Sequence, residues 1–231
     1  IRGAGNLLGG DQSGHMESVG FDLYIKLLEQ TVQELKGEEP ESEQRAAVNL
    51  NLDLKIDEQY IPDTNQRLTL YRRVAGAQAE SELAALLDEM CDRYGPIPAS
   101  VATLVGYGRV RLLADRLGVE TIDRDAHLLI LKFRSTTAVD PTRLMRFVER
   151  RSGVSLKPPS IMTVDLRDVS QRTSERQESW WTTRAHTAEV RGGFSRADYQ
   201  KAERSREGPI QLLARVGDLL VELCGMEAIE S

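Results

Sequence analysis

The sequence has no long apolar run, few cysteines and histidines, and few aromatic residues, which make up 5% of its 231 positions. No apolar stretch approaches the roughly 18 residues that a membrane-spanning helix needs, so we expect no membrane segment. The three histidines, His15, His127 and His186, are far apart and have no partners at the spacing of a zinc motif. The sequence therefore predicts no metal site.

The only two cysteines, Cys91 and Cys224, each lie among apolar residues of a helical pattern. Free cysteine is among the residues that proteins bury most often, so we expect two buried, reduced thiols. Reduced thiols are typical of a reducing compartment. This pattern favours a cytoplasmic location.

Basic residues do not exceed acidic ones. The chain has 30 Lys and Arg against 36 Asp and Glu, which gives a formal net charge of -6. Because nucleic-acid binding depends largely on basic side chains that neutralise phosphates, this balance argues against a domain that clamps nucleic acid over its whole surface. Any contact with DNA must be local. Hydrophobic residues, at 40%, are abundant enough for a well-packed core.

What the sequence does have is a glycine-rich beginning, IRGAGNLLGGDQSG, in which five of 14 residues are glycine. No initiating methionine precedes it, which predicts a fragment of a longer protein. Glycine permits a tight or mobile loop, or one that lies close against a ligand. The spacing lacks the lysine and hydroxyl pair of a nucleotide-binding P-loop. From the residues alone, a flexible chain end and a ligand-contacting loop both stay open.

Periodicity predicts a series of helices and strands beyond this loop. Apolar residues at helical spacing from Phe21 to Leu35 predict an amphipathic helix, and the charged stretch at 38–46 is expected to be a linker. Strict alternation from Val48 to Ile56 predicts a strand with one buried face. The other predicted elements are helices at 63–78 (with an Asp63 cap), 81–94 (with a Ser81 cap), 98–118, 141–148 and 209–224, strands at 119–123 and 127–133 joined by a turn at Arg124–Asp125, and a strand at 160–166.

This order predicts an α+β fold, with a helical layer packed on a small, mostly antiparallel sheet, preceded by the glycine-rich loop and the amphipathic helix. The loop and helix occupy residues 1–37, and the α+β domain occupies residues 47–231. Residues 168–206 are polar and poor in aliphatic side chains, which predicts an insertion in this domain. Trp180 and Trp181 within it need shelter from water, either by packing on the domain or through a partner.

Four short stretches, taken in order, resemble the transcription-repair coupling factors. RGAGNLLG at residues 2–9 and QSG at 12–14 are similar to the translocation motif that this family shares with the RecG helicases. VGFDLY at 19–24 resembles the helix after that motif. YIPD at 60–63, with the RL and YRR that follow, resembles the start of the family's C-terminal domain, and DRYGPIP at 92–98 resembles its next turn.

The resemblance implies a parent protein that moves along double-stranded DNA by using ATP, displaces stalled RNA polymerase and recruits nucleotide excision repair. The ATP-binding motifs would lie upstream, so this chain by itself is expected not to be an enzyme and to hold no cofactor, while ATP and Mg²⁺ would bind the parent. Residues 1–37 would end the translocation motif. The domain at 47–231 would be regulatory, because in this family it covers the parent's own N-terminal module, which binds the repair protein UvrA.

The resemblance also assigns the coupling of the motor to DNA movement to residues of the glycine-rich loop. These residues are Arg2, Gly3, Gly5, Gly9, Gln12 and Gly14.

Two groups of arginines are candidates for contacts with a partner protein. One group is Arg143, Arg146 and Arg150, which share a face of a predicted helix, and the other is Arg67, Arg72 and Arg73. Each group is either a solvated helix face or a docking patch for an acidic partner. Tyr60 is expected either to anchor a turn through its ring or to contact a partner.

The alternative function is a stand-alone DNA-binding module that uses the glycine-rich loop and the arginine faces, although the acidic balance disfavours it. Nothing in the sequence resembles a nucleophile, histidine and acid set, so a small-molecule enzyme has no support.

Overall fold

The computed structural model describes residues 45–137, 139–169 and 208–225. The glycine-rich loop, the helix predicted at 21–35, all but the last two residues of the linker and nearly all of the polar insertion, including both tryptophans, lie outside the described residues. Arg2, Gln12 and the loop glycines, for which a coupling role is predicted, are among these residues outside the described part of the chain.

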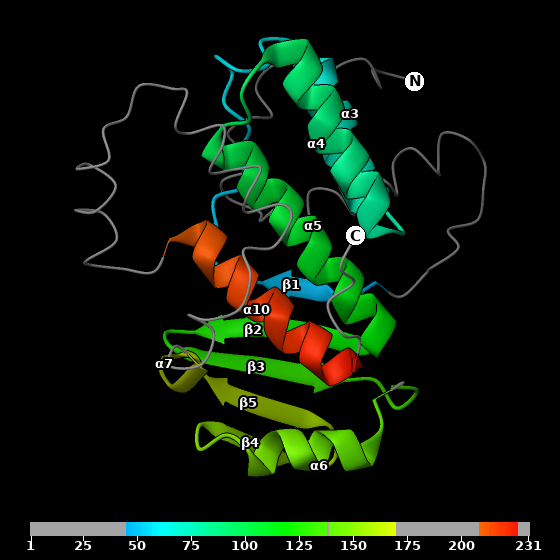
Figure 1. Cartoon of the computed structure of the whole chain (residues 1–231), viewed down its shortest axis with the longest axis vertical. Coiled ribbons are helices and arrows are strands. Elements are labelled where there is room, and N and C mark those ends of the chain that lie inside the picture. Colours follow the sequence, from blue (N-terminus) through cyan, green and yellow to red (C-terminus); the bar gives the residue numbers. More distant parts are fainter. Residues whose placement is uncertain (1–44, 138, 170–207, 226–231) are drawn as a thin grey trace, which may run out of the picture.

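The helices and strands alternate in blocks along the described chain (Figure 1). The strands are β1 (Ala47–Asn49), β2 (Val119–Asp125), β3 (Leu128–Phe133), β4 (Val154–Lys157) and β5 (Ile161–Asp165). The helices are α3 (Thr64–Gly76), α4 (Glu80–Tyr94), α5 (Ala99–Leu117), α6 (Pro141–Glu149), α7 (Leu166–Val169) and α10 (Pro209–Cys224).

The strands form one sheet in the order β1-β2-β3-β5-β4, in which only β1 and β2 are parallel. Val48 pairs with Ile122, which pairs across the next ladder with Leu131, and Leu131 pairs with Met162. Because residues directly opposite each other point to the same face, these buried side chains line one side of the sheet. The predicted α+β fold with a mostly antiparallel sheet is confirmed.

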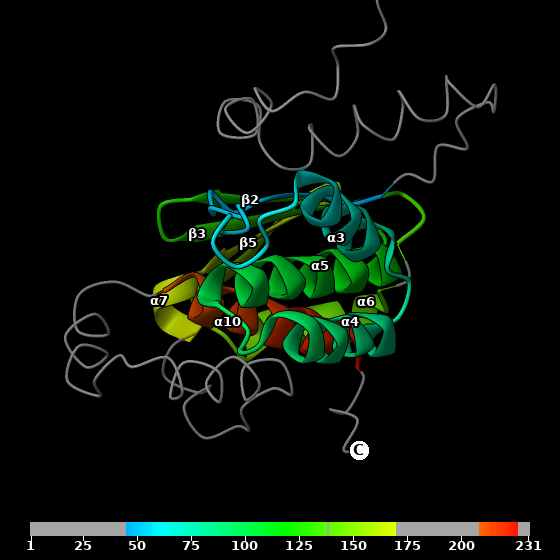
Figure 2. The same ribbon diagram turned by 90° about the horizontal axis from the view of Figure 1, so that it is seen from above.

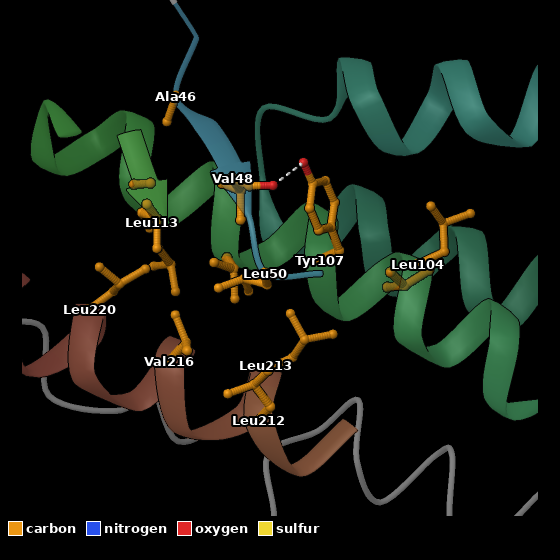
Figure 3. Packing of buried hydrophobic residues seen from close by; sticks show 14 of the residues in the cluster. Ala46, Val48, Leu50, Leu104, Tyr107, Leu113, Leu212, Leu213, Val216 and Leu220 are labelled. Carbon is orange, nitrogen blue, oxygen red and sulfur yellow. Dashed lines mark hydrogen bonds between the residues drawn. The ribbon is translucent and has the colours of Figure 1, made fainter. Parts of the chain in front are cut away.

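The helices gather on this apolar side of the sheet, with α3 and α4 on opposite sides of α5 (Figure 2). α5 is buried along most of its length, from Val101 to Ala114. α10, which is far away in sequence, lies beside α5 and contributes Leu213, Val216 and Leu220 to the core (Figure 3). The hydroxyl of Tyr107 donates to the carbonyl oxygen of Val48 at 3.1 Å, and this bond ties α5 to the short edge strand β1. One core thus joins the sheet and the helices.

Three of the helix ends predicted from capping residues, at Asp63, Gly118 and Asp140, are confirmed. The Asp63 carboxylate accepts from the backbone N–H of Gln66 at 2.9 Å, and Asp140 accepts from Thr142 N–H at 2.8 Å. Gly118 ends α5 with φ 67, the left-handed conformation that favours glycine. The prediction that Ser81 caps α4 is wrong, because this helix already begins at Glu80 and its cap position is Ala79.

The long strand predicted from Val48 to Ile56 is wrong in its hydrogen bonding but right in its alternation. Pairing ends at Asn49, and Asn51 has φ 53, a left-handed conformation that breaks an extended run. Leu54 and Ile56 are nevertheless buried. The Ile56 N–H donates to the Tyr71 hydroxyl oxygen at 2.7 Å, so a side chain satisfies this backbone group where the prediction expects a neighbouring strand.

Two further predictions are corrected. The β2–β3 turn lies at Ala126 and His127 and not at Arg124–Asp125, since the ladder continues to the pair Asp125 and Leu128. Cys91 is exposed, although Cys224 is partly buried, and both thiols are free. Burial raises the pKa of the Cys224 thiol.

Candidate protein-interaction surfaces

The two predicted arginine groups lie at opposite ends of the domain. Arg67, Arg72 and Arg73 belong to α3, which together with α4 forms one end, whereas α6 lies at the other end beside β4 (Figure 1). The structure therefore does not join them into one site. We treat them as two surfaces.

Arg67 points into the domain and serves its fold. Its side chain is only 12% exposed. Its guanidinium donates to the carbonyl oxygens of Ile61 at 2.8 Å and Pro62 at 3.0 Å, and lies 3.3 Å from the Glu58 carboxylate. These bonds fasten the turn before α3 to the first turn of the helix.

The α3–α4 surface consists of Arg72 and Arg73 from α3 and of Glu89, Asp92 and Arg93 from α4. Arg72 is exposed. The Glu89 carboxylate of α4 joins the two helices through the Arg73 guanidinium of α3 at 2.7 Å, and it lies 3.2 Å from the guanidinium of Arg93 on its own helix. Exposed ion pairs of this kind add little to stability. Their mixed charges suit recognition by a polar partner of complementary pattern.

Near the start of α3 and the end of α4, the two sequence motifs of the C-terminal domain meet. The Tyr60 hydroxyl lies 3.2 Å from the carbonyl oxygens of both Met90 and Gly95, and its ring centroid is 5.7 Å from that of Tyr94. The Tyr94 hydroxyl in turn donates to the Gln66 side chain. Burial is the main cause that raises the pKa of Tyr60 to about 12. The prediction that Tyr60 anchors a turn is confirmed, and the two motifs join the start of α3 to the end of α4.

A partly buried charged cluster holds the point at which the linker enters the domain. The Arg45 guanidinium donates to the Ala75 carbonyl oxygen at 2.7 Å, and the Arg111 guanidinium donates to the same oxygen. The Asp115 carboxylate accepts from the Ala46 N–H at 2.5 Å. Burial raises the pKa of Asp115, while the Ala46 bond and the neighbouring arginines oppose this rise. The end of the linker is therefore fastened to α3 and α5.

Sequence reasoning missed this cluster, and a second buried arginine with it. Arg109 and Arg111, each 7% exposed, belong to the most buried helix. Arg109 donates to the Glu80 carboxylate at 2.8 Å. The signal that could have found both is a charged residue inside a helix that is apolar on nearly every side, because such a residue needs a buried partner.

The α6 surface consists of Arg143, Met145, Arg146, Glu149 and Arg150. All five side chains are exposed. On its inner side the helix buries Phe147, while Leu144 and Val148 are partly buried. The predicted common face of the three arginines is therefore present, and the sequence prediction did not include Met145.

Two features, a metal-binding cluster and a membrane-spanning helix, are absent from the part of the chain that the structure describes. No group of three or more His, Cys, Asp or Glu side chains within it could hold a metal ion. None of its helices is both long and apolar enough to cross a membrane.

Fold and surfaces together define an α+β domain whose sequence motifs build its framework and whose mixed charges lie on the outside. Residues 50–144 match the family model of the TRCF domain. Three relatives are each a transcription-repair-coupling factor. That of Escherichia coli is 38% identical over 178 residues, covering 74% of this chain and 15% of the relative. That of Bacillus subtilis is 37% identical over 147 residues, covering 62% and 12%. That of Mycobacterium bovis is 31% identical over 239 residues, covering 97% and 17%.

A solved structure shows the same fold. The crystal structure of the C-terminal domain of a transcription-repair coupling factor aligns with 79% of this chain and 96% of its own, with a TM-score of 0.51 at 16% identity. The chain belongs to the transcription-repair coupling factor family and carries its C-terminal TRCF domain region. It spans 12 to 17% of the length of the three relatives named above.

Proposed function

We propose that this chain is the C-terminal part of a transcription-repair coupling factor and that its α+β domain restrains the parent protein. The match of residues 50–144 to the TRCF domain carries this proposal. The parent would be an ATP-dependent translocase on double-stranded DNA that displaces stalled RNA polymerase and recruits nucleotide excision repair in the cytoplasm. ATP and Mg²⁺ would bind the parent motor, outside this chain.

The glycine-rich loop would belong functionally to that motor. Arg2 offers a guanidinium that suits phosphate, and Gln12 offers both a donor and an acceptor. The glycines between them would let the backbone shift as the motor moves. In the parent, Arg2→Ala is expected to abolish DNA-stimulated movement while ATP binding is retained.

The α3–α4 surface is our proposed face for docking on the parent's own N-terminal module. A restraining contact has to form and then open, and a polar interface of moderate size can do both. This surface offers Arg73 and Arg93 on a single carboxylate, Glu89, and the exposed Arg72 beside Arg73 in the sequence. Tyr60 donates to backbone carbonyls near the end of α4 and Arg67 to those just before α3, so both helices of the surface are fastened at one end.

A deletion in the full-length parent tests the restraint. Removing residues 50–231 is expected to raise the affinity for purified UvrA, because the covered surface of the N-terminal module is freed. The measurement is the Kd for UvrA by biolayer interferometry, with DNA-dependent ATP hydrolysis recorded alongside it. Unchanged values for both would exclude a restraining role for this domain.

Point variants then test the face. Arg72→Glu together with Arg93→Glu in the parent should raise UvrA affinity several-fold, since charge reversal turns complementary contacts into repulsive ones. Arg146→Glu on α6 is the matched control, which changes the same charge at the other end of the domain. If the deletion raises the affinity and the α3–α4 variant does not, the domain restrains the parent through another face.

A further inference from the structure

The α6 surface concentrates like charge on one side of a short helix. Arg143, Arg146 and Arg150 follow one another at spacings of three and four residues, which places them side by side. Like charges at these spacings destabilise a helix by a few tenths of a kcal/mol per pair. A local conflict of this kind in an otherwise consistent fold is a common mark of a functional surface.

No acidic side chain within the described residues forms an ion pair with these three arginines. Arg143 donates to the Cys224 carbonyl oxygen at 3.1 Å, and Arg146 and Arg150 extend from the helix as exposed side chains. Glu149, the only acid of α6, forms no ion pair with them. The chain carries 36 acidic residues, so a lack of acids does not explain the arrangement.

Met145 adds an apolar side chain at the edge of this charged surface, on the side of Arg146 away from Arg143 and Arg150. Its side chain is 53% exposed, and it is the only large hydrophobic residue among the described positions that is exposed. It lies on the side of the helix opposite the buried Phe147. Methionine is flexible and polarisable, which suits a contact with an apolar side chain of a partner.

The N-terminus and the buried side of α6 are held by several contacts, so the exposed surface has a defined shape. Asp140 caps its N-terminus, and Phe147 is 4% exposed in the core. Arg151, just after the helix, lies over the Phe147 ring with its guanidinium carbon 4.6 Å from the centroid, and pairs with Glu222 of α10. Asp140, Phe147, Arg151 and Glu222 therefore fix α6 without engaging Arg146 or Arg150.

We propose that the α6 surface binds an acidic segment of a partner protein. The carboxylates of that segment pair with Arg146 and Arg150, and an apolar side chain beyond them packs on Met145, which lies about 100° around the helix from Arg146. Charge complementarity argues for this occupant, since guanidinium groups form strong, often bidentate hydrogen bonds with carboxylates. A net charge of -6 and an exposed thioether favour a peptide over a nucleic acid. The interaction goes beyond the proposed restraint, which uses the other end of the domain.

The test uses the full 231-residue chain and three synthetic peptides of equal length. The first repeats Glu-Glu-Leu, the second contains only Glu, and the third repeats Gln-Gln-Leu. Backbone amide shifts in nuclear magnetic resonance spectra locate binding, and fluorescence anisotropy gives the Kd. We expect the first peptide to bind best and to shift amides of α6.

Paired variants assign the binding to named side chains. Arg146→Glu with Arg150→Glu should weaken the first peptide by about tenfold or more, because two charge-assisted contacts become repulsive. Met145→Ser should weaken it several-fold through lost apolar contact. Arg72→Glu at the other end should leave the Kd unchanged. Arg146→Lys with Arg150→Lys retains the charge and should retain binding, and an unchanged urea unfolding curve of the Glu variant would show that its weaker binding does not come from misfolding.

Several results would overturn the proposal. One is equal binding of the all-Glu peptide, which would remove any role for Met145. Another is duplex DNA that, at low salt, removes the α6 amide shifts caused by the peptide and binds more tightly than the peptide does. That result would make the surface a nucleic-acid site. A third is a chain ended at Gly225 that binds the peptide much more tightly than the full chain, since residues 226–231 would then be the occupant.

Discussion

At the scale of single residues, Tyr60 shows how a motif residue supports a surface without belonging to it. Its hydroxyl reaches two backbone carbonyls at the end of α4, and its ring packs near Tyr94. Burial of the phenol disfavours its ionised form, which is why the pKa of Tyr60 rises from 10.0 to about 12. The residue therefore links two distant motifs and makes domain stability sensitive to alkaline pH.

Replacing Tyr60 with Phe should show this sensitivity. The unfolded chain ionises this phenol above pH 10 and the folded chain only near 12, so its stabilisation is complete below 10 and is lost as the pH rises from 10 to 12. Tyr60→Phe should cost about 1 kcal/mol at neutral pH through the lost hydrogen bond. Urea denaturation of both proteins across this range should show a smaller alkaline decline in the variant. Parallel curves would contradict the assignment.

At the scale of elements, the central helix α5 owes its position to a close approach at Gly108. A β-carbon built at Gly108 would lie 2.6 Å from Cγ1 of Val74 in α3, 3.4 Å from the Val74 carbonyl oxygen and 3.5 Å from Cδ2 of Leu83 in α4. Val74 is buried and branched at its β-carbon, so it has little freedom to move. Gly108 thus permits the close approach of α5 to α3, whereas a β-carbon would make only an ordinary contact with Leu83 of α4.

Gly108→Ala should destabilise the domain by about 1 to 3 kcal/mol, as expected for an extra methyl group in a filled core. Gly76→Ala, at the end of α3, is the matched control. A β-carbon there meets nothing within 4 Å. That variant should be neutral or more stable by up to about 1 kcal/mol, because alanine favours a helix over glycine. Thermal and urea unfolding measure both, and equal stability of the two variants would count against close packing at Gly108.

At the scale of the whole molecule, the last described helix completes a core that begins much earlier in the chain. α10 packs along α5, and Figure 3 shows its side chains meeting those of α5 and of the chain around β1. Arg143 and Arg151 also connect α6 to the end of α10. The TRCF match ends at residue 144, before this helix. The matched region is therefore only part of what holds the domain together.

Ending the chain at residue 207 should abolish cooperative unfolding. The buried side chains that would be lost are Leu212, Leu213, Val216, Leu219, Leu220 and Leu223. At about 1.5 to 3 kcal/mol each, their burial contributes roughly 10 kcal/mol or more, which is comparable to the whole stability of a typical domain. A chain ended at Gly225 serves as control. Circular dichroism during urea denaturation should show a transition in the control alone, and a transition in both would contradict the role of α10.

Local sequence was sufficient to predict most elements and several of their ends. The caps at Asp63 and Asp140 and the full extent of α10 are confirmed, because these features depend on residues a few positions apart. The arginine groups were also predicted as helix faces. Sequence could not show that Arg67 points inward or that Glu89 joins α3 to α4, since both facts depend on neighbours brought together by the fold.

The sequence by itself thus determined the helical and extended character of the segments, the fold class and the family resemblance. The tertiary structure decided that the chain leaves the sheet after Asn49, that β1 pairs in parallel with β2, and that α10 packs on α5. It also decided that the two arginine groups lie at opposite ends of one core (Figure 1). The physical reason is range: backbone propensity and capping act over a few residues, whereas pairing, burial and surface charge depend on residues far apart in sequence.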